Sequence, residues 1–226
     1  MKERPILFST SMVKAILNGT KTQTRRVVNK APTTEINHRL IALDNGWNWQ
    51  VDQQGIVPTM HREIDNPMVC PFGQIGDRLW VRETFCYGRI DEFDAEHPED
   101  RSLYVDQDAS DKNYQRAVHK QWCLENNVDI EEVVWKPSIH MPRWASRILL
   151  EITNIRVEPL KDISNEDAKA EGFDYSTHPS AIEMGYSIGA KTNFRITWEQ
   201  IYGQNEWNKN PWVWVVEFKV IQGGAA

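Results

Sequence analysis

Residues 19–26, which read Gly-Thr-Lys-Thr-Gln-Thr-Arg-Arg, are the stretch of this sequence that decides its fold. The four apolar side chains among residues 12–17 are spaced as on one face of a helix, and Ser9 or Thr10 is a suitable N-cap for it. Gly19 then supplies the C-cap, so the helix is short. The chain leaves this helix through a polar, basic run.

Lys21 and Thr24 lie three residues apart, so on a tight turn or a helical end their side chains face the same way. A lysine that loses its proton on burial acts as a base toward a hydroxyl, which would make Thr24 a nucleophile. A solvated basic turn is the alternative interpretation of the same residues.

Hydrophobic patterns outside this stretch predict further elements. Strands are expected at residues 5–8, 47–51, 79–85, 133–135, 147–157 and 212–221. Helices are expected at residues 112–126, 164–171 and 194–202, with loops at 135–144 and 174–192. Strands and helices do not alternate as in a parallel α/β sheet, and neither a repeat nor a linker divides the chain. The sequence therefore predicts a single α+β domain, a compact β-barrel with peripheral helices.

The charge of the chain is unevenly distributed. The 226 residues carry a formal charge of −6, which argues against a nucleic-acid partner. Residues 91–132, however, hold thirteen acidic and four basic side chains, a balance of −9, and the rest of the chain has a balance of +3. Residues 1–90 hold twelve basic and eight acidic side chains, a balance of +4. The acidity thus belongs to one segment, which we interpret as a solvated insertion.

Cysteine usage and hydropathy indicate the compartment. The three cysteines are widely spaced, as in a reducing cytoplasm, and the scattered histidines offer no metal site. No apolar run approaches the roughly 18 residues of a membrane span, and the first residues lack the apolar run of a secretory signal. We therefore expect a cytoplasmic protein without a cofactor, a metal or a membrane partner. The oligomeric state stays open.

Four stretches together resemble one family. Residues 19–26 resemble the Gly-x-Lys-x-x-(Thr/Glu)-x-Arg signature of the ASCH domain, a PUA-like mixed β-barrel. Three more stretches match that family in order: residues 76–83 its Gly-Asp-x-Leu-x-Val strand, residues 163–172 its helix ending in Ala-x-x-Glu, and residues 214–219 its closing strand. The resemblance implies one ASCH-type domain over residues 1–226, with flanking helices and insertions at about 30–70 and 86–145. Longer phage and bacterial ASCH-containing proteins are similar in overall layout.

The resemblance also implies chemistry. Small bacterial members of the family are amidohydrolases that deacetylate N4-acetylcytidine with a triad of Lys, Thr and Glu, which falls here on Lys21, Thr24 and Glu171. In that interpretation Thr24 attacks the acyl carbonyl, Lys21 takes its proton, and Glu171 orients Lys21 or protonates the leaving amine.

Further residues are candidates for binding the ligand in a basic cleft. They are Arg25, Arg26, Glu83 and Trp144, the last being the tryptophan best placed to stack on a base because it lies in the irregular loop. Most other tryptophans are expected in the core. Two alternatives to hydrolysis stay open: a non-catalytic module that binds RNA or a modified nucleic acid, and a metal-independent ribonuclease. The expected partner in each case is a modified nucleoside or RNA.

Overall fold

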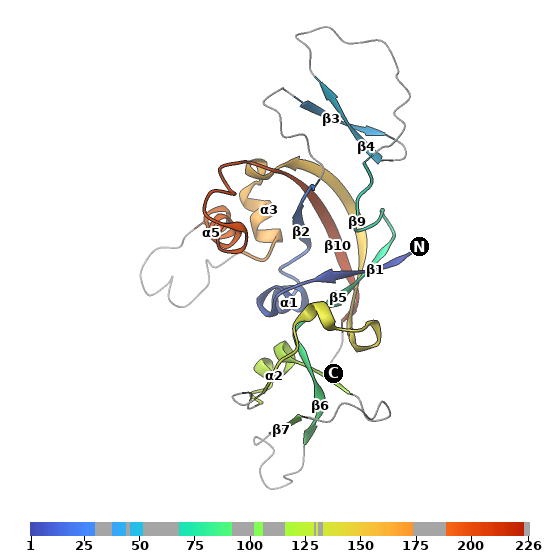
Figure 1. Cartoon of the computed structure of the whole chain (residues 1–226), viewed down its shortest axis with the longest axis vertical. Helices are drawn as coiled ribbons and strands as arrows, with labels where there is room; N and C mark the ends of the chain where they lie inside the picture. The colour runs from blue at the N-terminus through green and yellow to red at the C-terminus, as the bar shows by residue number, and fades with distance from the viewer. Residues whose placement is uncertain are drawn as a thin grey trace. The chain divides into compact units, whose positions relative to one another are not determined.

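The protein was analysed as a computed structural model of the 226-residue chain. It describes residues 1–29, 38–43, 46–51, 68–91, 102–105, 116–128, 130, 133–173 and 189–223, with the backbone alone for 38–43, 46–51, 89–91 and 102–105. Within these ranges the fold is α+β, with four α-helices and both parallel and antiparallel strand pairs (Figure 1). The predicted fold class is thus confirmed. The sheets of the described ranges form no closed barrel, so the PUA-like barrel stays a prediction.

The chain divides into two compact units, each assembled from separate stretches of sequence. The first contains Met1–Thr22, Gly76–Glu151 and Phe218–Ala226, and the second contains Gln23–Ile75 and Ile152–Glu217. The long strands β9 (Ile148–Pro159) and β10 (Trp212–Gly223) contribute residues to both units. Each unit is described by itself below.

The first unit is built on the strand order β1-β5-β9. Strand β1 (Glu3–Leu7) runs parallel to β5 (Arg78–Arg82), which is antiparallel to the start of β9. Its other elements are α1 (Thr10–Leu17), β6 (Phe85–Asp91), β7 (Ser102–Val105), β8 (Ala117–His119), α2 (Lys120–Glu125) and the 3-10 turns η1 (Ser138–His140) and η2 (Arg143–Ala145). Strand β6 pairs antiparallel with both β7 and β8. Small apolar clusters pack around Phe85 and around Cys86.

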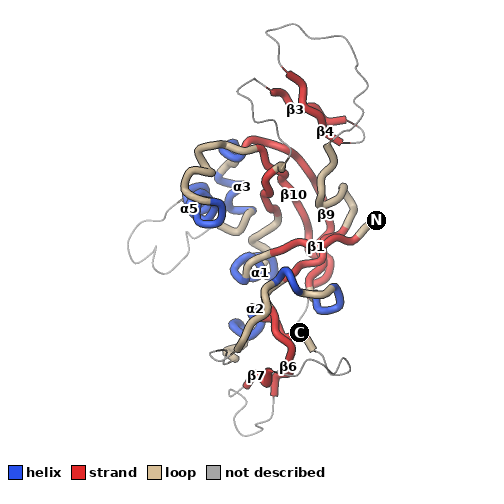
Figure 2. The backbone as a smooth tube through the Cα atoms, in the orientation of Figure 1, coloured by secondary structure: helices blue, strands red, loops and turns tan. Residues whose placement is uncertain are grey.

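The second unit has the strand order β9-β10-β2, and β2 (Gln23–Val27) is antiparallel to β10. It also contains the antiparallel pair β3 (His38–Leu43) and β4 (Gly46–Val51), the 3-10 turn η3 (Leu160–Asp162), and helices α3 (Asn165–Ala170) and α5 (Ala190–Tyr202). Figure 2 shows α3 and α5 together beside β2 and β10. Their core includes Phe194, Trp198 and Val215.

Helix ends follow the local sequence as expected. The Ser9 hydroxyl accepts a hydrogen bond from the Met12 amide at the start of α1, and Gly19 takes a φ of +73° just after its end. Ser164 and Asp167 form a reciprocal capping box at the start of α3, and Gly172 follows this helix with a φ of +90°. These local signals therefore placed both helices correctly.

Other predicted elements differ in the structure. Residues 133–135 form no strand, because this stretch joins the sheet only through an isolated bridge between Phe85 and Lys136. Within the predicted helix 112–126, only Lys120–Glu125 is helical and β8 precedes it; residues 112–115 lie outside the described residues. Most of the acidic segment 91–132 and of the predicted insertion 30–70 also lies outside them. Helix α5 begins four residues before the predicted start at 194.

Candidate functional site

Strand β2 divides the residues of the 19–26 stretch between two faces of the sheet. Side chains alternate along a strand, and Arg25 lies opposite Val215 of β10. Val215 belongs to the core that α3 and α5 cover, so Arg25 shares this covered face. Thr24 and Arg26 consequently lie on the opposite face, and Arg26 is half-buried.

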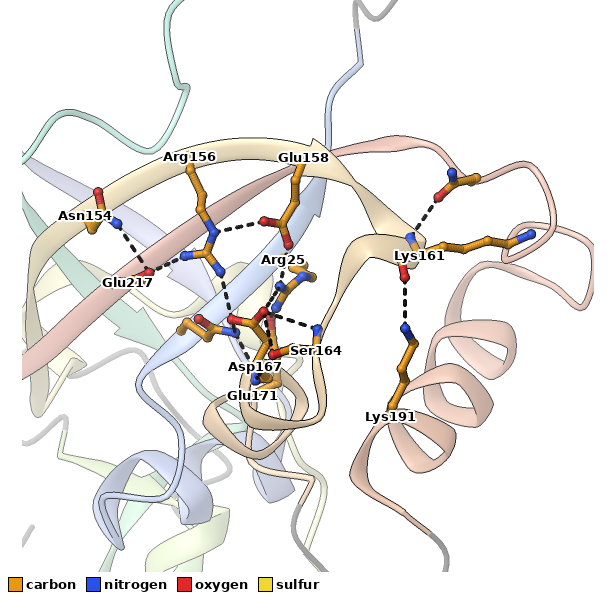
Figure 3. Close-up of polar contacts among 12 residues, drawn as sticks. Arg25, Asn154, Arg156, Glu158, Lys161, Ser164, Asp167, Glu171, Lys191 and Glu217 are labelled. Atoms are coloured by element: carbon orange, nitrogen blue, oxygen red, sulfur yellow. Dashed lines mark hydrogen bonds and ion pairs between the residues drawn. The ribbon is translucent and has the colours of Figure 1, made fainter. Parts of the chain in front are cut away.

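The side chain of Arg25 is wholly buried and is surrounded by carboxylates (Figure 3). Its Nη2 lies 2.5 Å from Glu158 Oε1 and 3.3 Å from Asp167 Oδ2, and its Nη1 lies 3.2 Å from Glu171 Oε1. The guanidinium also lies over the ring of Phe194, 6.0 Å from the centroid. A buried guanidinium needs such partners, because an unpaired charge is costly in the interior. This network accounts for Arg25 without a ligand.

A second arginine extends the same network. Arg156 Nε donates to Glu158 at 2.9 Å and its Nη2 donates to Asp167 at 2.8 Å, while its Nη1 bonds Glu217 (Figure 3). These carboxylates raise the pKa of Arg156 above its ordinary value, although burial acts in the opposite direction. The two arginines therefore tie β2, β9 and β10 to the start of α3. We call these six charged residues the carboxylate network: Arg25, Arg156, Glu158, Asp167, Glu171 and Glu217.

Asp167 is the member with the most polar contacts. Partial burial favours its neutral form, but a hydrogen bond from Gln23, hydrogen bonds from Ser164 and the charge of Arg25 lower the pKa of this carboxyl to about 2. Arg156 donates to the same oxygen as Gln23. The carboxylate of Asp167 is therefore a fixed anion at ordinary pH.

The three residues assigned to the triad are all buried. The exposed fraction is 1% for Lys21, 1% for Thr24 and 4% for Glu171. Glu171 follows the last residue of α3 and accepts a hydrogen bond from Arg25, on the covered face of β2. Thr24 is on the same strand but faces the other side. Lys21 belongs to the first unit, where its Nζ lies 5.7 Å from the centroid of the Phe8 ring.

Glu83, a predicted ligand-binding residue, is buried in the first unit and pairs with Arg147. Arg147 Nε and Nη2 donate to its two carboxylate oxygens at 3.0 and 3.1 Å, which is the bidentate geometry of a strong ion pair. The Glu83 amide also bonds the sulfur of Met141. Its partner thus comes from the segment preceding β9.

Trp144 is the exposed tryptophan that the sequence singled out. Its exposed fraction is 55%, and its ring lies almost parallel to that of Tyr87, with the centroids 6.1 Å apart. Trp80 and Trp214 are buried, as expected of tryptophans in strands. The irregular loop predicted at 135–144 contains η1 and most of η2, and its Met141 is buried.

Sequence reasoning missed several charged residues of the carboxylate network. Asp167 carried one local signal, since it stands three residues after Ser164 in a capping box. Arg156 and Glu158 carried another, their spacing of two along β9, which places both on one face of that strand. The partner of Glu158 on β2 is Arg25, which is 133 residues away in sequence, so no local pattern could identify this pair.

The described residues offer no group of His, Cys, Asp and Glu that could hold a metal ion. None of the helices in the described part of the chain combines the length and apolar composition needed to cross a bilayer.

Comparisons with known proteins add little to this geometry. No protein-family model and no curated protein matches the chain. A solved structure from Enterococcus faecalis V583, described by the family model DUF984, is similar with a TM-score of 0.37 and 11% sequence identity, over 100% of this chain and 84% of that chain. A similarity at that TM-score supports no conclusion about fold or function.

Proposed function

We propose that this protein is an ASCH-type amidohydrolase with a PUA-like barrel, and that it acts on an N4-acylated cytosine nucleoside or a related modified base. The proposal rests on the resemblance of four ordered stretches to that family and on the three polar residues at its triad positions. The substrate class is an acylated exocyclic amine, carried by a free nucleoside or by a nucleic acid.

In the proposed reaction the Thr24 hydroxyl is the nucleophile. Its oxygen forms a bond to the acyl carbon while its proton passes to the neutral amine of Lys21. The C–N bond then breaks and the cytosine amino group leaves with a proton. Water hydrolyses the threonyl ester, which releases the carboxylic acid and restores the hydroxyl. The resemblance assigns Glu171 to orient Lys21 or to supply the proton to the leaving amine, although its carboxylate bonds Arg25 on the face of β2 opposite Thr24.

The burial of the triad residues is the observation that carries the proposal. Lys21, Thr24 and Glu171 have exposed fractions of 1%, 1% and 4%. Lysine and glutamate are rarely buried to this degree, and a lysine removed from water is the kind that proteins use as a base. A solvated basic turn, the alternative interpretation of residues 19–26, would leave Lys21 in water.

Arg25 has a different role in this proposal from the one its sequence position suggested. Because its guanidinium is buried among carboxylates, we assign it to positioning Glu171 through the hydrogen bond of 3.2 Å. Arg26 is half-buried on the same face as Thr24, and we assign it to binding an oxyanion or a phosphate of the substrate.

The experiment that tests the proposal measures release of cytidine and acetate from N4-acetylcytidine, and of the corresponding products from longer N4-acyl cytidines. We expect turnover by the wild type and its loss in Glu171→Gln. Glu166→Gln is the matched control, since Glu166 lies on the same helix but is exposed. Absence of product from every acylated cytidine at high enzyme concentration would overturn the proposal.

A second candidate function is non-catalytic binding of RNA or a modified nucleic acid. One observation favours it, the exposed ring of Trp144 stacked on Tyr87. Base stacking on exposed aromatic side chains is the usual way in which proteins hold unpaired nucleotides.

A further inference from the structure

Trp144, in the segment between α2 and β9 that contains η1 and η2, and Tyr87 of β6 form an aromatic pair in the first unit. One face of the Trp144 ring lies against Tyr87, with an angle of 17° between the ring planes. The exposed fraction of Trp144 is nevertheless 55%, so much of the side chain outside this contact is open to solvent. An open indole face of this kind is costly to keep in water and is suited to stacking on a flat partner.

The backbone on both sides of Trp144 is anchored by contacts with other elements of the first unit. Arg82 Nε donates to the Met141 carbonyl at 3.0 Å, and the Met141 side chain is fully buried. The carbonyl of Ala145, the residue after Trp144, lies 2.8 Å from His119 Nε2. Trp144 therefore lies between two backbone positions that are fixed by contacts with Arg82 and His119.

The segment that contains Trp144 is basic. Residues 133–150 contain Lys136, Arg143 and Arg147 and no acidic side chain. Lys136 Nζ lies 5.1 Å from the centroid of the Tyr87 ring, and no carboxylate of the described residues pairs with it. Arg143 and Arg147 each pair with a glutamate, so Lys136 is the cation of this segment that remains available to an anionic ligand.

We infer that Trp144, Tyr87 and Lys136 form a binding site for single-stranded nucleic acid, in which an unpaired base stacks on the open face of Trp144 and a neighbouring phosphate contacts Lys136. The inference rests on the second candidate function and does not depend on hydrolysis. A flat aromatic face and a cation that pairs with no carboxylate of the described residues match the two parts of a nucleotide, the base and the phosphate. A duplex keeps its bases stacked on one another and offers no such face along its length.

The test measures binding of the full chain to fluorescently labelled ten-nucleotide oligo(U) and oligo(dT) at low salt by fluorescence anisotropy. The two oligomers distinguish RNA from DNA as the ligand. We expect Trp144→Ala to weaken binding about 5- to 150-fold, the range that loss of one base–aromatic stack produces. Trp144→Phe should restore most of the affinity. Lys136→Gln should lower the salt dependence by about one phosphate contact.

Tyr202→Ala supplies the matched control. Tyr202 is also partly exposed and packs on another aromatic ring, that of Trp198 in α5, but it belongs to the second unit. This variant should bind as the wild type does. Oligonucleotide binding that survives Trp144→Ala, or equal binding of a blunt duplex, would overturn the site while leaving nucleic-acid binding in place. Absence of any binding by the wild type would overturn both.

Discussion

Arg25 and Glu171 are joined by a hydrogen bond of 3.2 Å in the interior of the second unit, although they are 146 residues apart in sequence. One belongs to the stretch that resembles the family signature and the other follows helix α3. Their contact links two of the four resembling stretches, and it links a residue assigned to the triad with the carboxylate network.

Removal of Arg25 should be strongly destabilising. Arg25→Met leaves Glu158, Asp167 and Glu171 without a buried cation, and we expect a loss of about 3–5 kcal/mol in the free energy of unfolding. Urea denaturation measures this loss. Arg195→Met is the matched control, because Arg195 forms an exposed pair with Glu199 on α5 and should cost at most about 0.5 kcal/mol. Equal costs for the two variants would contradict a structural role for Arg25.

Asp167 should make the stability of the protein depend on acid pH. Its folded pKa, about 2, lies below the ordinary value of 3.8, so the unfolded chain binds a proton first as the pH falls. The stabilisation is complete above about pH 5 and is lost as the pH falls toward 2.

The measurement for Asp167 is the free energy of unfolding of the wild type and of Asp167→Asn between pH 6 and pH 2. We expect the difference between them to shrink over the lower part of this range. Glu166→Gln, an exposed change in the same helical turn, should show a smaller change with pH. A constant difference for Asp167→Asn would contradict the lowered pKa.

His119 should make the stability of the protein depend on pH in a higher range than Asp167 does. Burial lowers the pKa of this histidine below 6.5, although Glu83 and the Ala145 carbonyl favour the charged form. The unfolded chain therefore takes up a proton that the folded protein does not, and stability falls as the pH drops below about 6.5.

Unfolding measurements between pH 7.5 and pH 5 test this expectation for His119. The wild type should lose at most about 1.4 kcal/mol per pH unit through this one group. His119→Gln should show a flatter profile, whereas replacement of the exposed His140 by Gln should follow the wild type. If the two variants gave the same profile, the buried histidine would not be the source of the pH dependence.

Local signals in the sequence were sufficient for the elements that they describe directly. The caps at Ser9 and Ser164 and the glycines after α1 and α3 are contacts within a few residues, and the structure has them. Pairing between distant strands was not accessible in this way. The stretch at 133–135 has the side chains of a strand, but among the described residues no strand pairs with it and only Lys136, just after it, forms an isolated bridge.

Contacts between residues far apart in sequence also explain what the sequence analysis missed at the candidate site. Lys21, Thr24 and Glu171 followed from the order of four motifs, whereas the place of Arg25 depends on carboxylates contributed by β9 and α3. From residues 19–26 alone, Arg25 and Arg26 are equivalent basic side chains. Alternation along β2 separates them, because it turns Arg25 toward the covered face and Arg26 away from it.

The central claim is that the Thr24 hydroxyl is the nucleophile of an amidohydrolase. The most direct measurement is the initial rate of cytidine release from N4-acetylcytidine by the wild type, by Thr24→Ala and by Thr22→Ala. Thr22 lies in the same stretch but is exposed, so it controls for loss of a threonine there. The account predicts turnover by the wild type and by Thr22→Ala and at least a thousandfold loss, on the order of 4 kcal/mol in the barrier, in Thr24→Ala. Full activity in a folded Thr24→Ala protein, or none in the wild type, would contradict it.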